Sequence, residues 1–244
     1  MTHDFVAIMQ PYLQNLGLKL TNWQIEKINL LGNSMLADPI YKSVSKIFEP
    51  EDIALKHFLD SIAPLKFDLV CWKKAEQVVD LGTGGGFPLL PLAIMKPECR
   101  FLGVDSRQKS VEFVARMAEA TGLENVRVKH ARIEELGRDS QHREKNDLVI
   151  CRALSAVRTL LEYTLPLTRD GGFSLYFKGP RLEQEIADAA TAMRELGVAE
   201  GQLSFYELSE PEIPFSRGYL LVEKKNSVPA KYPRKNGLPS SRPL

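Results

Sequence analysis

Residues 78–88, VVDLGTGGGFP, place four glycines within five positions, shortly after Asp80. The β-branched residues at the start of this stretch predict a buried strand. Glycines permit positive φ and let the backbone approach a ligand where a Cβ would clash. In an open parallel sheet, ligands bind beyond the carboxyl ends of the strands, at the switch point beside the first strand. This stretch therefore predicts a ligand site at the end of a strand.

The spacing of these glycines distinguishes between classes of ligand. Nicotinamide dinucleotides are bound by G-x-G-x-x-G, but Phe87 occupies the third glycine position here. The pattern is instead D-x-G-x-G-x-G, which begins at Asp80 and includes Gly82 and Gly84. It resembles the first motif of the class I S-adenosylmethionine (SAM) methyltransferases. A nicotinamide enzyme and a non-catalytic protein with this fold remain the alternatives.

Two carboxylates are suitably spaced to hold parts of such a cofactor. Asp80 is a candidate for an electrostatic role near the ammonium group of SAM. Asp105 ends the next predicted strand, 25 residues after Asp80. A carboxylate at that place can accept hydrogen bonds from both ribose hydroxyls, in dinucleotide enzymes and in methyltransferases alike.

The elements that position these residues alternate along the chain. Apolar strand candidates at 77–82, 100–106, 126–130, 147–153 and 172–179 are interspersed with the helical segments 107–122 and 180–197. Such alternation predicts βαβ units with helices on both faces of a mainly parallel sheet. The last two strand candidates, 202–209 and 218–225, are joined too closely for a crossover helix and should pair antiparallel. We expect an α/β, Rossmann-like class I methyltransferase fold with seven strands.

The regions on either side of this unit differ from it in composition. Residues 1–66 read as helices, among them 11–17, 22–38 and 51–59, so we expect an N-terminal helical region, a SAM-binding domain at 67–223 and a basic tail at 224–244. The tail holds six Lys and Arg residues and no acid, so residues 1–223 carry 26 basic against 31 acidic residues, about −5. One interpretation is a solvated, partly disordered end. The other is a phosphate-seeking arm for nucleic acid, in which Tyr232 stacks on a base or packs back on the domain.

Composition also excludes several classes of protein. No apolar run reaches the ~18 residues that span a membrane, and the first residues lack a signal pattern. The three cysteines are far apart and the four histidines are scattered, which argues against a metal site and a disulfide framework. We expect a cytoplasmic protein with reduced thiols.

The residues after the fourth strand restrict the methyl acceptor. An Asn-Pro-Pro-Tyr-like motif for exocyclic amines is absent, because the sequence there reads CRAL. Cys151 lacks the Pro-Cys or Thr-Cys context of a nucleophile for pyrimidine C5, so we expect it to be a buried strand residue. Guanine N7 carries an in-plane lone pair and needs no general base, which makes it compatible with this sequence.

Several motifs together resemble the ribosomal RNA small subunit methyltransferase G family, also called glucose-inhibited division protein B. They are HFLDS at 57–61, the glycine stretch, CRAL, GGFSLYFKG at 171–179 and YPRKNGLP at 232–239. The resemblance implies SAM-dependent methylation of guanine N7 in a conserved loop of 16S ribosomal RNA, with the RNA or the small ribosomal subunit as partner and a monomeric enzyme. A SAM-dependent small-molecule methyltransferase and a non-catalytic RNA-binding protein remain alternatives.

The resemblance also implies roles for individual residues. The cofactor-binding positions match Gly82, Gly84, Phe87, Asp105, Ile133, Glu134 and Arg152. Arg152 is in addition a candidate for the base pocket, with structural ion pairing as the other interpretation. Lys178 and Gly179 should face the same cleft. His57 and Asp60 either bridge to this cleft or form a structural pair between the helical region and the main domain.

Overall fold

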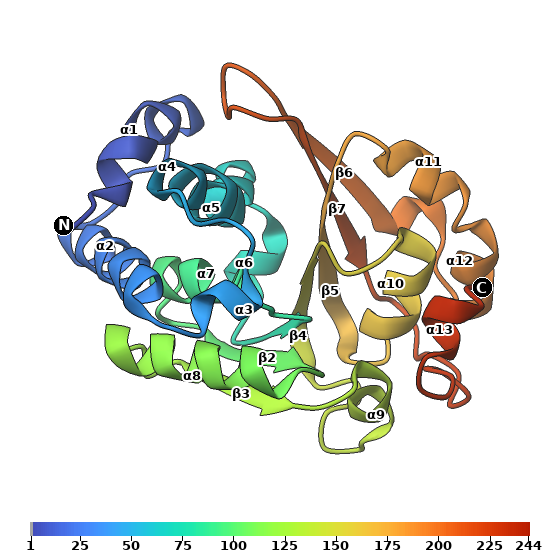
Figure 1. Cartoon of the computed structure of the whole chain (residues 1–244). Coiled ribbons are helices and arrows are strands. Elements are labelled where there is room, and N and C mark those ends of the chain that lie inside the picture. Colours follow the sequence, from blue (N-terminus) through green and yellow to red (C-terminus); the bar gives the residue numbers. More distant parts are fainter. Residues whose placement is uncertain (1) are drawn as a thin grey trace.

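Seven strands form one sheet that runs through the middle of the molecule (Figure 1). The computed structural model describes residues 2–244. The strands are β1 (Gln77–Leu81), β2 (Arg100–Asp105), β3 (Val126–His130), β4 (Asn146–Arg152), β5 (Thr168–Lys178), β6 (Leu203–Leu208) and β7 (Arg217–Glu223). Their order is β3-β2-β1-β4-β5-β7-β6. Strands β1 to β5 pair in parallel, whereas β7 runs antiparallel to both β5 and β6. The predicted fold class and the antiparallel pairing of the last two strands are confirmed.

Helices cover both faces of the sheet (Figure 1). One face is covered by α1 (Phe5–Leu16), α2 (Asn22–Ala37), α3 (Tyr41–Val44), α6 (Val70–Lys74), α7 (Leu89–Met95), α8 (Gln108–Thr121), and a helical run made of α4 (Pro50–Asp52), the π-helix η1 (Ile53–Leu59), α5 (Asp60–Ile62) and the 3₁₀-helix η2 (Ala63–Phe67). The other face is covered by α9 (Ile133–Arg138), α10 (Val157–Thr164), α11 (Leu182–Ala187), α12 (Ala190–Leu196), the 3₁₀-helix η3 (Glu200–Gln202) and α13 (Leu238–Ser241).

Each face of the sheet has its own hydrophobic cluster. Successive strand residues point to opposite faces, so Val78 belongs to the cluster that includes the N-terminal helices, while Val79 belongs to the cluster that includes α10 and α12. The first cluster runs from Phe5 on α1 to Leu221 on β7. The N-terminal helices therefore share a continuous core with the sheet, across the expected boundary at residue 66. The division of the chain into three parts stays a prediction.

Local signals explain where the N-terminal helices begin. The carboxylate of Asp4 accepts from the amide of Ala7, so α1 starts at Phe5 and not near the predicted residue 11. Thr21 and Gln24 form a reciprocal capping box at the start of α2. The predicted helical segment 180–197 is present as two helices, α11 and α12. No helix among residues 2–244 is long and apolar enough to cross a membrane.

The segment 224–244 packs against the sheet and its helices, so the expectation of a disordered end is wrong. Tyr232 is 3% exposed and its hydroxyl donates to Glu195 at 2.8 Å. Arg143 donates to the main-chain oxygens of Tyr232 and Val228, at 2.7 and 2.8 Å. Tyr232 therefore packs on the domain, which is one of the two interpretations of this residue.

Most positive charges of this segment are paired with carboxylates. The ion pairs are Lys224–Glu144, Lys225–Glu223, Lys231–Glu195 and Arg234–Glu162. Among the described residues, only Lys235 and Arg242 of the six cations lack an ion pair. Few charges are thus left for phosphate contacts.

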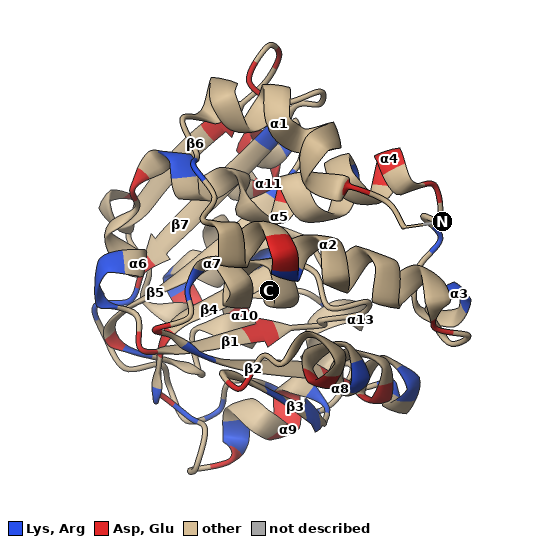
Figure 2. Ribbon diagram, turned by 90° about the vertical axis from the view of Figure 1, so that its left-hand side faces the viewer, with Lys and Arg blue, Asp and Glu red and all other residues tan. Residues whose placement is uncertain are grey.

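Charged side chains are unevenly distributed over the helices on the N-terminal side. Figure 2 shows α1 without any charged residue and α8 with residues of both signs. Mixed signs do not create the single-sign field that draws a polyanion.

Replacement of Arg234 by methionine should destabilise the protein. Glu162 is fully buried, and Arg234 donates to both of its oxygens, with Nε at 2.9 Å and Nη2 at 2.6 Å. Removing one partner of a buried pair leaves an uncompensated charge and typically costs about 3–5 kcal/mol. We expect Arg234→Met to lower the free energy of unfolding in urea by about 3 kcal/mol.

Arg242→Met is the matched control, because this exposed cation lies in the same segment and has no ion pair within residues 2–244. It should change the free energy of unfolding by less than about 0.5 kcal/mol. An equal loss in the two variants would contradict a specific role for the buried pair.

Candidate functional site

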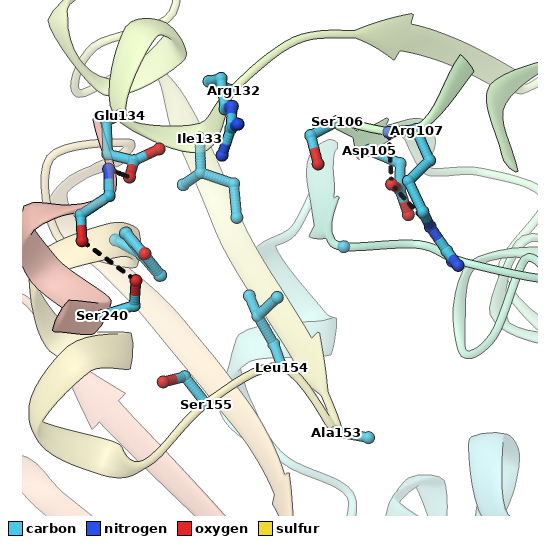
Figure 3. Close-up of a pocket in the computed structure, with 13 residues that line it drawn as sticks. Asp105, Ser106, Arg107, Arg132, Ile133, Glu134, Ala153, Leu154, Ser155 and Ser240 are labelled. Atoms are coloured by element: carbon cyan, nitrogen blue, oxygen red, sulfur yellow. Dashed lines mark hydrogen bonds and ion pairs between the residues drawn. The ribbon is translucent and has the colours of Figure 1, made fainter. Parts of the chain in front are cut away.

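A cavity of about 410 Å³ opens at the carboxyl ends of β1, β2 and β4 (Figure 3). It lies where parallel sheets bind ligands. Residues that follow four strands contribute to its walls, and the C-terminal segment adds a further wall. The lining residues are Gly82, Asp105, Ser106, Arg107, Arg132, Ile133, Glu134, Ala153, Leu154, Ser155, Tyr163, Gly237 and Ser240. We call it the first cavity.

Asp105 connects the glycine loop to the second strand. Its Oδ2 accepts from the amide of Gly84 at 2.9 Å, and its Oδ1 accepts from the amide of Arg107 at 2.8 Å. A carboxylate has about four lone-pair sites, so about two remain for a ligand in the first cavity. This fixed carboxylate suits the two hydroxyls of a ribose.

Gly82 allows the loop to pass close to β4. Its φ is +73°, and a Cβ built there would lie 2.7 Å from Leu154 Cδ1. Any other residue would therefore be strained, and the end of the Leu154 side chain would have to shift to make room for its Cβ. The bare backbone keeps this part of the first cavity open.

Apolar and acidic side chains lie together at the opposite end of the first cavity. Ile133 and Glu134 begin α9, and Tyr163 comes from α10. Glu134 is buried, and its Oε1 accepts from the amide of Gly237 at 2.7 Å. An apolar wall next to a held carboxylate is suited to a heterocyclic base with an exocyclic amine.

Asp80 does not line the first cavity. It is 1% exposed, and neither carboxylate oxygen has a hydrogen-bond partner within residues 2–244. Burial raises the pKa of Asp80 to about 7. Its expected role near an ammonium group stays a prediction.

A second cavity of about 460 Å³ meets the first at Ala153, which lines both. It is lined by Ile47, Lys56, His57, Asp60, Arg152, Ala153, Phe177, Lys178, Gly179, Pro180, Arg181, Glu185 and Arg217. Five of these residues are basic and two are acidic, which gives a formal charge of +3. The first cavity, with two basic and two acidic residues, is neutral.

Asp60 is clamped by two arginines from different strands. Arg152 at the end of β4 donates to its Oδ2 at 2.8 Å, and Arg217 at the start of β7 donates to Oδ1 at 2.7 Å and Oδ2 at 3.1 Å. The Asp60 side chain is 2% exposed. This network connects the N-terminal helical run to the sheet. The structure therefore shows the ion pairing that the structural interpretations of Asp60 and Arg152 predict.

His57 lies between Arg152 and the glycine loop. Its ring stacks on Phe87, with centroids 4.1 Å apart and planes 13° apart. Arginine only donates, so His57 Nδ1 accepts from Arg152 Nη2 at 3.3 Å, and Nε2 carries the proton toward Ser45 Oγ at 3.2 Å. Burial, followed by the charge of Arg152, lowers the pKa of His57 to about 3. The ring is therefore neutral at neutral pH.

Lys178 is held at the end of β5. Its Nζ donates to the main-chain oxygen of Ser155 at 2.9 Å and pairs with Glu185 Oε2 at 2.5 Å. The backbone amide of Val157 also donates to that Glu185 oxygen. These contacts fix the loop after β4, which separates the two cavities.

The predicted site residues divide between the two cavities. Gly82, Asp105, Ile133 and Glu134 line the first cavity. Arg152, Lys178, Gly179, His57 and Asp60 line the second. Gly84 supports Asp105 through its amide, and Phe87 packs behind His57. Their roles in cofactor binding stay predictions.

Some lining residues had no clear signal in the sequence. Arg217 comes directly before the predicted strand 218–225, where a polar residue without a special role is equally common. Gly237 lies in the conspicuous stretch YPRKNGLP and Ser240 directly follows it, but the spacing of this stretch does not indicate that it reaches the first cavity. No group of three or more His, Cys, Asp or Glu residues within 2–244 is arranged to hold a metal ion.

Comparison with known proteins assigns the family. The family model described as rRNA small subunit methyltransferase G (GidB) matches residues 24–213. The chain belongs to the rRNA small subunit methyltransferase G family. A member from Alkaliphilus metalliredigens is 34% identical, over 97% of this chain and 98% of its own length. A member from Deinococcus deserti is 43% identical, over 79% of this chain and 78% of its own length.

Solved structures of methyltransferases share the fold. The SAM-dependent methyltransferase SibL, in its apo form, aligns with a TM-score of 0.53 and 16% identity, over 90% of this chain and 74% of its own. A SAM-dependent O-methyltransferase from Thermotoga maritima aligns with a TM-score of 0.51 and 12% identity, over 80% of this chain and 72% of its own. At this identity the likeness concerns the fold alone.

Asp105→Asn should weaken SAM binding. The amide nitrogen cannot accept hydrogen bonds, so either the loop amides or the ligand lose one acceptor, and the charge is lost. Hydrogen bonds to charged groups contribute about 1.5–3 kcal/mol, so we expect the Kd for SAM to rise about ten- to hundredfold. Isothermal titration calorimetry measures it. Asp188→Asn, at an exposed helix end, is the control and should bind as the parent does; equal weakening in both would contradict the role.

His57→Gln should remove part of the acid sensitivity of the fold. His57 is neutral in the folded protein down to about pH 3, whereas in the unfolded chain it takes up a proton below about pH 6.5. Stability is therefore lost as pH falls from about 6.5 toward 3, by about 1.4 kcal/mol per pH unit from this residue. Urea unfolding of parent and variant at several pH values should show a difference of that slope, and parallel curves would refute it.

Proposed function

We propose that this chain transfers the methyl group of SAM to N7 of a guanine in a conserved loop of 16S ribosomal RNA. Membership of its family makes it a SAM-dependent methyltransferase of small-subunit ribosomal RNA. The observation that supports the acceptor side is the contact of two unlike cavities at Ala153. One is neutral with fixed carboxylates, and the other is positively charged.

The first cavity fits SAM. Its volume lies within the ~300–1,000 Å³ usual for small-ligand sites. The remaining lone pairs of Asp105 are available to ribose hydroxyls, and Ile133 and Glu134 are available to the adenine. When bound, SAM supplies an electrophilic methyl group on a sulfonium. The residues of the chain bind and orient it and exclude water around it.

The positive charge of the second cavity favours an RNA segment over a neutral metabolite. Nucleic-acid binding depends largely on contacts between Lys or Arg and phosphates. Arg181 and Lys56 line this cavity, and both residues are exposed. Lys56 forms only a surface ion pair. An unstacked base can enter such a cavity while its neighbouring phosphates meet these cations.

The chemistry available in the second cavity favours an acceptor that needs no deprotonation. Asp60 is ion-paired with two arginines, and the lowered pKa of His57 makes that ring a weak base. Burial also raises the pKa of the Cys151 thiol, which disfavours the thiolate needed for pyrimidine C5 methylation. Guanine N7 attacks through its own lone pair, so alignment with the methyl group suffices. We further infer a monomeric enzyme that works in the cytoplasm.

Transfer of labelled methyl groups from SAM tests this proposal. Small ribosomal subunits that lack the modification are incubated with the protein, and the digested RNA is examined for 7-methylguanosine. We expect label in 7-methylguanosine at one 16S site. Label in another nucleoside would refute the N7 acceptor, and SAM binding without any label in RNA would favour a small-molecule acceptor.

Arg152→Ala provides a variant for the same assay. Arg217 still pairs with Asp60 in this variant, so the fold should persist. Loss of the guanidinium at the junction of the cavities should misplace the base and reduce methyl transfer about 100-fold. Asp188→Asn is again the unaffected control, and full activity of Arg152→Ala would refute its role.

A further inference from the structure

The C-terminal segment contacts four of the six residues of the short helix that carries Glu134. Arg138 donates to the main-chain oxygen of Arg234 at 3.0 Å and to Asn236 Oδ1 at 2.7 Å. Asn236 Nδ2 in turn donates to Glu135 at 2.6 Å. The amide of Gly237 donates to Glu134 itself. Helix α9 is therefore held from outside by a segment that lies about 100 positions later in the chain.

Close packing supports these hydrogen bonds. A Cβ on Gly137 would lie 2.8 Å from Pro233 Cγ, so the segment fits against α9 only because this position is a glycine. The Arg234–Glu162 pair fixes the same segment to α10. Beyond it, Gly237 and Ser240 reach the first cavity and form part of its wall (Figure 3).

We propose that residues 232–241 are part of the SAM site: they hold Glu134 in its position, and they close the cavity wall beside the adenine nucleoside. This inference rests on the proposed function, in which the first cavity binds SAM. It assigns the segment to the cofactor and not to RNA. The pairing of most of its cations with carboxylates agrees with that assignment.

The segment and the cofactor should stabilise each other. Ligand binding and the ordering of a binding element are linked reciprocally, so loosening one weakens the other by the same factor. The contacts of Asn236 with Glu135 and Arg138 should therefore affect SAM affinity although these residues do not line the first cavity. Asn236 is a positioning residue in this scheme, because it acts through α9.

Asn236→Ala in the full-length protein tests this inference. Asn236 is exposed and makes only surface hydrogen bonds to α9, so the fold should be kept. We expect the Kd for S-adenosylhomocysteine, measured by calorimetry without RNA, to rise at least about threefold. Arg242→Ala removes an exposed cation just beyond this stretch and should leave this Kd unchanged. In the parent, S-adenosylhomocysteine should slow hydrogen exchange at residues 232–241, and at the Gly237 amide in particular.

The outcomes separate this inference from the proposed function. If the parent binds S-adenosylhomocysteine but Asn236→Ala binds it equally well, the role of the segment is refuted while the SAM site stands. Weaker RNA binding by Asn236→Ala at unchanged S-adenosylhomocysteine affinity would overturn the inference in favour of an RNA-binding arm. If the parent does not bind S-adenosylhomocysteine, the cofactor assignment of the first cavity fails, and this inference fails with it.

Discussion

The buried carboxylate of Asp60 constrains the arrangement of the site more than any other single group. A buried charge is tolerated only when it is paired and hydrogen-bonded, and Asp60 obtains its partners from β4 and β7. These strands lie on either side of β5. The N-terminal helical run must therefore sit over the carboxyl ends of β4 and β5 and the amino end of the antiparallel β7, where its residues form one wall of the second cavity. The same ion pairs orient Arg152 toward His57 and Phe87. The carboxylate of Asp60 thereby connects the helical region to the glycine loop.

Two different electrostatic environments, one neutral and one positively charged, lie next to each other at the carboxyl ends of the parallel strands. In the first cavity, Asp105 is held by main-chain amides and keeps lone pairs for a neutral nucleoside. In the second, basic side chains outnumber acidic ones, which suits a polyanionic substrate. Ala153 lies between the two cavities and lines both. Its φ is +54°, a conformation that non-glycine residues seldom adopt. The turn after β4 thus brings the two cavities next to each other, as the proposed methyl transfer requires.

The sheet and half of the site follow from local patterns, whereas the rest depends on distant segments. Strand alternation and the glycine spacing predict the fold and place Gly82 and Asp105 at the carboxyl ends of two neighbouring strands, because both are consequences of short-range geometry. Ion pairing is different: the partners of Asp60 lie 92 and 157 positions away. Periodicity carries no information about such contacts. The same holds for the basic tail, whose composition indicates disorder but whose charges find carboxylates on α10, α12 and the loop before β4.

The position of Gly237 and Ser240 in the wall of the first cavity has a consequence for biosynthesis. The chain is made from its N-terminus, and the sheet with its N-terminal helices can form before residues 232–241 leave the ribosome. Until they do, Glu134 lacks its main-chain donor and Glu162 lacks its arginine. A chain that has emerged only as far as β7 would therefore have the sheet and its helices, but the wall of the first cavity would be incomplete.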